Sequence, residues 1–360
     1  MARKLLGIVL SLAILFTLHG CKEKSNLADD ISIVNEAAQS DVILLAGLSK
    51  SAIAESGYGE IAYRYLNYIQ DALPGRIKNT QREREAAVFI VSALLDMGYA
   101  KDSIQVQSFK NDYVEYQPTD DIFDGGERTE TSQNVILTKK GDSDKVLIIG
   151  AHYDSVGTHG INDNGSGVSV VMENAMRMFD IQTPYTLRYI FFGSEESRQK
   201  GSNYYVESLS WREKRKIVAM VNFDCILAGE TLYMFGGKFK KDGSIANDWA
   251  ACQASEFAAE LGLDIRWQQP KSYEMLFDSG FTRGGTDYLP FNLAGIPYIA
   301  FDALNMGDSG GTTEGEGWVL HNSSDDLEYL NKVFPGRAER NLMEYSVLLE
   351  HIAIHFYQLP

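Results

Sequence analysis

The chain has 360 residues, of which 49 are acidic and 33 are basic, so that its formal net charge is −16. Proteins that bind nucleic acids carry basic surfaces, and this sequence has no long basic run, so we expect no nucleic-acid partner. Roughly 300 residues follow the N-terminal segments, which is enough for one large domain with a well-buried core. No internal repeat or Pro/Gly-rich linker divides this part of the sequence.

The N-terminal residues have the composition of a secretory signal. Arg3 and Lys4 precede an apolar run over residues 5–18, which is too short for a comfortable membrane span. The run ends at Leu-His-Gly-Cys, which resembles the bacterial lipobox except for its His, and in which Cys21 would be acylated. An ordinary cleaved signal with an incidental Cys is the alternative.

These features predict three segments of the chain. Residues 1–20 would be the signal peptide, residues 21–45 a lipidated Cys and polar tether, and residues 46–360 a single folded domain. We therefore expect an exported protein that faces the periplasm or the cell exterior and is anchored to a membrane through Cys21. The other two cysteines, Cys225 and Cys252, are too few for a disulfide framework, and we expect buried free thiols rather than a bridge.

Apolar runs alternate with helical patterns along the domain. This alternation predicts an α/β fold with a mostly parallel central sheet and helices on both of its faces. Strands are expected at residues 104–109, 132–138, 145–150, 185–192, 217–224, 231–235 and 296–303. Helices are expected at residues 81–99, 167–180, 202–216, 247–262 and 338–358.

Charged side chains follow three of the predicted strands. His152 and Asp154 come after the first of these strands, Glu195 and Glu196 after the second, and Asp224 after the third. A single acidic residue after a strand is usually a helix cap or a turn former. Because open α/β sheets bind ligands outside the carboxyl ends of their strands, three such positions together predict a ligand site at this edge.

Two further segments add candidate metal ligands. Asp163 lies in "INDNGSG", a stretch that is ordinary turn chemistry by composition but also follows His152 closely. His321 precedes a predicted helix start, where Ser323, Ser324 and Asp325 offer capping side chains. Alone, His321 would more often be a surface residue; with the other candidates it supplies a second imidazole.

The segments around these candidate residues resemble, in their order and approximate spacing, the motifs of the co-catalytic zinc exopeptidases. This family includes bacterial leucyl-type aminopeptidases, and it has glutamate carboxypeptidases and glutaminyl cyclases as relatives. The resemblance runs from about residue 74 to residue 321. It is carried by "GAHYDS", "INDNGSGV", "FFGSEES", "NFD", "GGTDYLPF" and "HNSSDDL".

The resemblance implies a site that holds two zinc ions. It makes His152 and Asp224 ligands of one ion and Glu196 and His321 ligands of the other, with Asp163 bridging the two. Imidazole and carboxylate are ligands that zinc accepts, and a pair of metals can hold both an attacking water and a substrate carbonyl.

Three more roles follow from the resemblance. Glu195 would be the general base that takes a proton from the attacking water and delivers it to the leaving amine. Asp154 would orient the imidazole of His152, and Asp325 could do the same for His321.

The sequence departs from the family pattern at two places. Many of these aminopeptidases have Tyr before the last His, where this chain has Leu320, so that Tyr288 or a backbone N–H would have to stabilise the oxyanion. The pattern "EExGLxGS" reads "EESRQKGS" here, so Ser197 and Arg198 leave the floor of the substrate pocket undefined by the resemblance.

The resemblance favours an aminopeptidase that removes N-terminal residues from peptide substrates. A glutaminyl cyclase would use one zinc and usually lacks the Asp-Asn pair of "INDNGSG". A carboxypeptidase for acidic dipeptides is another alternative, in which Arg283 could pair with a substrate carboxylate. A non-catalytic binding relative would be expected to lack ligands that this sequence retains.

Overall fold

The computed structural model describes residues 32–33, 35, 50–111, 122–239, 245–267, 285–304, 313 and 317–357. The expected signal peptide, Cys21 and Arg283 lie outside these residues. Within the described part of the chain, no helix combines the length and the apolar character needed to cross a membrane.

The described elements alternate between strands and helices along the chain. The strands are β1 (Ile104–Lys110), β2 (Thr131–Lys139), β3 (Ser143–His152), β4 (Tyr185–Phe192), β5 (Ile217–Phe223), β6 (Leu232–Phe235), β7 (Lys238–Phe239), β8 (Ile245–Ala246), β9 (Ile265–Trp267) and β10 (Tyr298–Asp302). The α-helices are α2 (Lys50–Glu55), α3 (Glu60–Ala72), α4 (Gln81–Asp96), α5 (Ser166–Arg177), α6 (Lys200–Ser208), α7 (Trp211–Lys214), α8 (Trp249–Glu260), α10 (Tyr288–Leu293), α11 (Leu327–Val333) and α12 (Arg337–His355). Three single turns complete the set: η1 (Lys101–Ser103), η2 (Ile161–Gly165) and η3 (Glu195–Ser197).

Eight of the strands form one sheet in the order β1-β2-β4-β3-β5-β10-β6-β9. The four central strands β4, β3, β5 and β10 run parallel to one another, and β9 is parallel to β6. Antiparallel pairs join β1 to β2, β2 to β4, and β10 to β6. The predicted α/β fold with its parallel centre is therefore confirmed, and every predicted strand is present.

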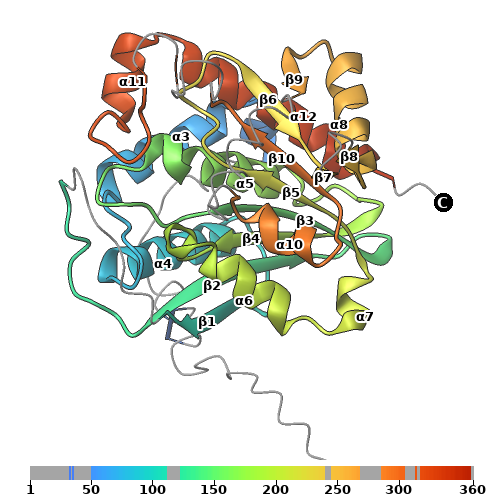
Figure 1. Ribbon diagram of the computed structural model, residues 1–360, viewed down its shortest axis with the longest axis horizontal. Helices are drawn as coiled ribbons and strands as arrows, with labels where there is room; N and C mark the ends of the chain where they lie inside the picture. Colours follow the sequence, from blue (N-terminus) through green and yellow to red (C-terminus); the bar gives the residue numbers. More distant parts are fainter. Residues whose placement is uncertain are drawn as a thin grey trace, which may run out of the picture.

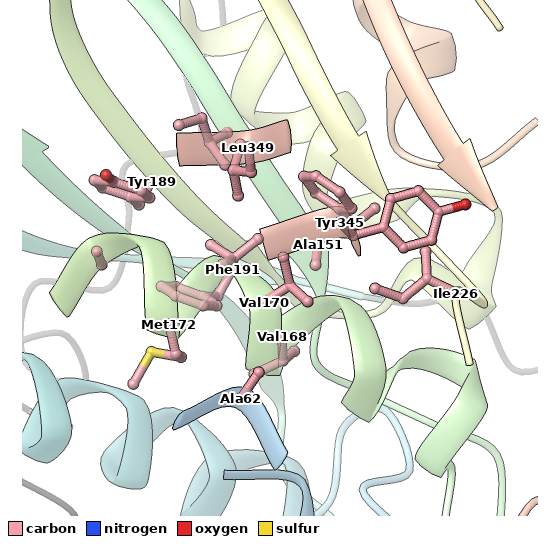
Figure 2. Close-up of a cluster of buried hydrophobic side chains, with 14 of the residues drawn as sticks. Ala62, Ala151, Val168, Val170, Met172, Tyr189, Phe191, Ile226, Tyr345 and Leu349 are labelled. Atoms are coloured by element: carbon pink, nitrogen blue, oxygen red, sulfur yellow. The ribbon is translucent and has the colours of Figure 1, made fainter. Parts of the chain in front are cut away.

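Helices cover both faces of this sheet, which explains why its central strands are apolar almost throughout. On one face, α3, α4, α5, α8 and α12 build the larger hydrophobic cluster. Figure 2 shows its centre, where side chains of α3, α5 and α12 meet those of β3 and β4; among them are Ala62, Ala151, Val168, Phe191 and Leu349. On the other face, α6 and α10 pack together over the sheet and form a smaller cluster (Figure 1).

Two local predictions were wrong. The helix expected over residues 202–216 is broken, because Ser210 caps a separate helix, α7, in a reciprocal capping box with Glu213. The helix after His321 is capped by Asp326, whose side chain accepts the backbone N–H of Tyr329, and not by the three residues expected. Ser-x-x-Glu was readable in the sequence as a helix start, whereas the choice between two adjacent aspartates was not.

Candidate metal centre

The three charged strand ends meet at one edge of the sheet. His152 is the last residue of β3, Glu195 and Glu196 lie in η3, which two residues separate from the end of β4, and Asp224 directly follows β5. Since β4, β3 and β5 are neighbouring parallel strands, their carboxyl ends bring these side chains together. The charged residues at the three strand ends thus converge, as their positions in the sequence predict.

Asp163 reaches the same place from η2, which hydrogen bonds fix on both sides. Asn162 Oδ1 accepts the backbone N–H groups of Leu227 and Ala228 at 3.0 and 2.9 Å. Asn164 Nδ2 donates to the carbonyl oxygen of Phe223 at 2.8 Å. The two asparagines are therefore structural, as loop chemistry predicts, while the carboxylate of Asp163 between them is left to face the strand ends.

The carboxylate of Asp163 lies between the two imidazoles. Its Oδ1 is 3.1 Å from His152 Nε2, and its Oδ2 is 3.0 Å from His321 Nε2. Asp224 Oδ1 lies 3.5 Å from His152 Nε2, and Glu196 Oε1 lies 3.1 Å from His321 Nε2. The five side chains thus form two groups of three that share Asp163, and within each group the ligand atoms lie within 4.8 Å of one another.

The residues present fit a pair of bound cations. His152 Nε2, Glu196 Oε1 and Asp224 Oδ1 are buried, yet none of them makes a hydrogen bond of acceptable geometry within the described part of the chain. Buried polar atoms without partners are costly, and atoms of this kind that converge on one space are what a metal ion would satisfy. The mixture of imidazole nitrogens and carboxylate oxygens is a donor set that suits zinc.

The electrostatics of the centre also favour bound cations. The carboxylate of Glu196 raises the pKa of His321 to about 12, and burial only partly opposes this. For His152, burial lowers the pKa, but Asp224, Asp154 and Asp163 outweigh it and raise the value well above normal. Burial, opposed by His152, raises the pKa of Glu195 well above its usual value. Both imidazoles are therefore held in a surplus of negative charge that bound cations would offset.

Asp154 lies beneath the Glu195–Glu196 doublet and is fully buried. Its Oδ1 accepts the backbone N–H of Glu195 at 2.9 Å, and its Oδ2 accepts that of Glu196 at 3.2 Å. His152 Nδ1 lies 3.1 Å from the carbonyl oxygen of Asp154 and 3.5 Å from its Oδ1. The His152 imidazole therefore hydrogen-bonds to the backbone carbonyl of Asp154, while the carboxylate of Asp154 holds the backbone of the doublet, which sequence reasoning did not foresee.

Glu83 holds the backbone N–H of Ser194, the residue before the doublet. Its fully buried carboxylate accepts the backbone N–H of Ser194 at 3.0 Å and the hydroxyl of Ser132 at 2.7 Å. Its other oxygen accepts the backbone N–H of Asn79 at 2.7 Å. Thr80-x-x-Glu83 has the sequence pattern of a capping box, but the Glu83 carboxylate accepts from Asn79 and Ser194 and not from Thr80, and so holds the loop after β4.

Arg76 is a second buried group that the sequence argument missed. Its guanidinium donates to the carbonyl oxygens of Leu73, Tyr153, His159 and Gly160 at 2.6–2.9 Å. These contacts tie the segment between His152 and Asp163 to the chain before α4. A fully buried Arg is rare enough to signal such a role, but burial is not visible in the sequence.

Several residues of the centre adopt left-handed backbone conformations. Among the described non-glycine residues, positive φ occurs at Asn79, Ser194, Arg198, Gln199, Cys225, Asn247 and His321. Five of these seven lie within two residues of a candidate ligand or of η3. Such conformations are costly for residues other than Gly and persist where the surrounding structure enforces them, which is common at functional sites.

The structure also places Tyr288, Asp325 and the two cysteines, for which the sequence predicted roles or burial. Tyr288 is buried on the face covered by α6 and α10, where its ring stacks on Tyr298 with centroids 4.4 Å apart, a placement that favours a packing role over an oxyanion role. Asp325 accepts the backbone N–H groups of Asn162 and Asp163, so its contacts support the η2 turn. Cys225 and Cys252 are unpaired as expected, but Cys252 is exposed on α8 and not buried.

Residues 134–346 match the model of peptidase family M28, and this span is more than half of the chain. The chain belongs to peptidase family M28. The matched residues contain all of the candidate ligands and the doublet, so family M28 membership and the geometry concern the same part of the molecule.

Curated relatives of this M28 chain include aminopeptidases. One from Bacillus subtilis is 34% identical over 213 residues, which cover 56% of this chain and 41% of that protein. A probable lipoprotein aminopeptidase of Mycobacterium tuberculosis is 34% identical over 182 residues, which cover 46% of this chain and 33% of that protein. The chain therefore matches less than half of the length of either relative.

Solved structures share the fold of this M28 chain at low sequence identity. A zinc aminopeptidase from Bacillus subtilis has a TM-score of 0.58 and 18% identity, covering 81% of this chain and 95% of that structure. A glutaminyl cyclase from an Acidobacteriales bacterium has a TM-score of 0.59 and 17% identity, covering 82% and 94%. Because the two scores are nearly equal, the fold does not separate the two activities.

Proposed function

We propose that this M28 chain is a zinc-dependent aminopeptidase that removes N-terminal residues from peptides at a centre holding two metal ions. The observation that carries the proposal is the shared Asp163, whose two oxygens face His152 and His321 and so join two three-residue ligand groups. His152 and Asp224 would hold one ion, and Glu196 and His321 the other. Zinc fits this donor set, and the relatives named as aminopeptidases support the activity.

When bound, a pair of metals supplies Lewis acidity and makes an attacking water acidic enough to react near neutral pH. Glu195 is buried at the edge of this centre, next to a ligand but not itself in either ligand group. Its carboxylate would take the proton from the attacking water and deliver it to the leaving amine. Asp154 would hold the backbone of the doublet, so that Glu195 and Glu196 keep their separate directions.

A glutaminyl cyclase is the second candidate, and a specific observation favours keeping it: a cyclase of the same fold is as similar in structure as the zinc aminopeptidase. Against it, Asp163 is placed between two ligand groups, and the cyclase reading uses one zinc. The carboxypeptidase alternative rests on Arg283, which lies outside the described residues. A non-catalytic relative would not need the complete donor set.

We further propose that the protein is exported and tethered by a lipid on Cys21, with its catalytic domain on the periplasmic or outer side of a membrane. The lipobox-like sequence carries this proposal. The relative described as a lipoprotein aminopeptidase is consistent with it.

One experiment tests the proposed activity. Purified protein would be analysed for metal and then assayed against a panel of aminoacyl amides and an N-terminal glutaminyl peptide, with and without a chelator. We expect two zinc ions per chain and chelator-sensitive release of N-terminal residues. One zinc with formation of pyroglutamate would favour the cyclase, and a metal-free protein without turnover would favour a binding role.

A further inference from the structure

The side chain of Gln199 contacts the carboxylate of the proposed base. Gln199 Nε2 donates a hydrogen bond of 3.0 Å to Glu195 Oε1, and the backbone N–H of Gln199 donates to the carbonyl oxygen of Glu195 at 2.8 Å. Glu195 is only 9% exposed and Gln199 is half-buried. A hydrogen bond to a carboxylate is strong, and partial shielding from water strengthens it further.

The backbone of Gln199 is fixed in a way that aims this side chain. Gln199 has a φ of 54° and is the residue before α6, yet its side chain does not cap that helix. Its carbonyl oxygen accepts three hydrogen bonds, from the backbone N–H and Nδ2 of Asn203 and from the hydroxyl of Ser202. Gln199 thus keeps a disfavoured backbone conformation because hydrogen bonds hold both its carbonyl oxygen and its side-chain amide.

The contacts of the doublet leave the direction of the Glu195 carboxylate free, and the contact with Gln199 restricts it. Glu83 and Asp154 hold the backbone N–H groups of Ser194, Glu195 and Glu196, so the peptide units cannot turn. The Glu195 side chain can still rotate about its own bonds, because a backbone contact does not fix the direction of a carboxylate. A proton acceptor acts efficiently only when it is held at the right distance and angle.

We propose that Gln199 is a positioning residue for the base, and that its amide holds the Glu195 carboxylate in the direction in which it meets the attacking water. The inference rests on the proposed function, because it needs Glu195 to be the proton acceptor. Gln199 lies in the segment "EESRQKGS", where this chain departs from the family pattern "EExGLxGS"; that pattern has Leu at the position of Gln199. The polar residue thus adds a contact to the base that Leu could not make.

Two substitutions separate this role from a merely structural one. Gln199→Leu removes the amide and keeps the size of the side chain, so we expect kcat to fall about tenfold with KM and metal content unchanged. Gln199→Asn shortens the side chain by one methylene, out of reach of Glu195, but Asn tolerates the positive φ of this position better than Gln does. We expect Asn to lower kcat as Leu does while raising the melting temperature.

The control is Lys200→Gln, which changes the next residue at the same helix start and should leave both quantities near wild type. If Gln199 only stabilised the start of α6, kcat would follow the melting temperature, and Gln199→Asn would be at least as active as wild type. That result, or kcat within about twofold of wild type for Gln199→Leu, would overturn the inference.

Crystal structures of the wild type and Gln199→Leu give a readout that does not depend on turnover. We expect one orientation of the Glu195 carboxylate in the wild type, with Gln199 Nε2 in contact, and more than one in the Leu variant. A single unchanged orientation in both would refute the inference even if the enzyme is an aminopeptidase. A wild type that hydrolyses no aminoacyl substrate would contradict the proposed function, and the crystallographic comparison would still decide the role of Gln199.

Discussion

The carboxylate of Glu83, at the start of α4, accepts the backbone N–H of Ser194, which lies 111 residues later and directly precedes the Glu195–Glu196 doublet. The turn before α4 and the loop after β4 therefore share one buried acidic group. Because both carboxylate oxygens are used, the loss of this side chain would leave several buried donors without an acceptor.

We predict that Glu83→Ala lowers the free energy of unfolding by about 2–4 kcal/mol, since several buried donors would lose their acceptor. Glu85→Ala is the matched control on the same helix. Its ion pair with Arg82 is more than a third exposed, so a change of about 0.5 kcal/mol or less is expected. Urea unfolding of the two variants measures both values, and equal destabilisation would show that the Ser194 contact contributes little.

Metal-free protein should become less stable as the pH rises from about 5 to 8. Burial, with repulsion from Asp154, raises the pKa of Glu83 to about 8, and burial with repulsion from Asp163 raises that of Asp325 to about 7. A group whose pKa is higher in the folded than in the unfolded state binds more protons when folded, so its contribution to stability is lost as the pH increases through this range. The raised pKa of His321 acts in the same direction.

The measurement is the urea midpoint of chelated protein at pH 5 and pH 8, with Glu83→Gln as the control. The midpoint should be lower at pH 8, and the difference should be smaller in the Gln variant, which has no charge to bury at that position. A midpoint that rises with pH in the chelated protein would contradict this assignment of buried groups.

Asp163 and Asp154 should differ in what their removal does to metal binding. Asp163→Ala removes the carboxylate that faces both imidazoles, so both metal content and turnover should fall sharply. Asp154→Ala leaves the ligand set complete and should weaken metal affinity by roughly 10–100-fold through loss of support for His152 and the doublet. Metal analysis after dialysis against graded chelator distinguishes them. Full occupancy and normal activity in Asp163→Ala would show that its carboxylate had been wrongly assigned.

The lipid anchor can be tested independently of the centre. Cys21→Ser removes the residue that a lipoprotein signal would acylate, so we expect the protein to change from membrane-associated to soluble or unprocessed. Fractionation of cells that express the wild type and the variant measures this. A wild type found entirely in the soluble fraction would rule out the anchor.

Much of the fold could be predicted because apolar pattern and burial coincide in it. The strand expected at residues 185–192 is β4 with the same bounds, since a strand covered on both faces must be apolar along most of its length. The candidate ligands could also be named, because imidazole and carboxylate side chains at the ends of adjacent strands converge for geometric reasons.

The supporting contacts could not be predicted, because they join segments far apart in the sequence. Asp154 meets the doublet across 41 residues, and Asp325 meets the η2 turn across more than 160. Each acidic residue also has an ordinary local reading as a cap or turn former, which leaves no pattern to suggest the distant partner. Gln199 was visible only as a departure from a family pattern, and the departure did not show that its amide contacts Glu195.

The most direct test of the central claim is the metal content and turnover of Glu195→Gln, measured on the same preparation and compared with Glu196→Gln. Gln keeps the size of the side chain but removes its basicity, and general acid–base help is worth about 10²–10⁴-fold. We predict that Glu195→Gln retains both metals, still binds a peptide-like inhibitor and loses nearly all turnover, whereas Glu196→Gln loses metal first. If Glu195→Gln emptied a metal site, or turned over peptides at close to the wild-type rate, the division of base and ligand within the doublet would be contradicted.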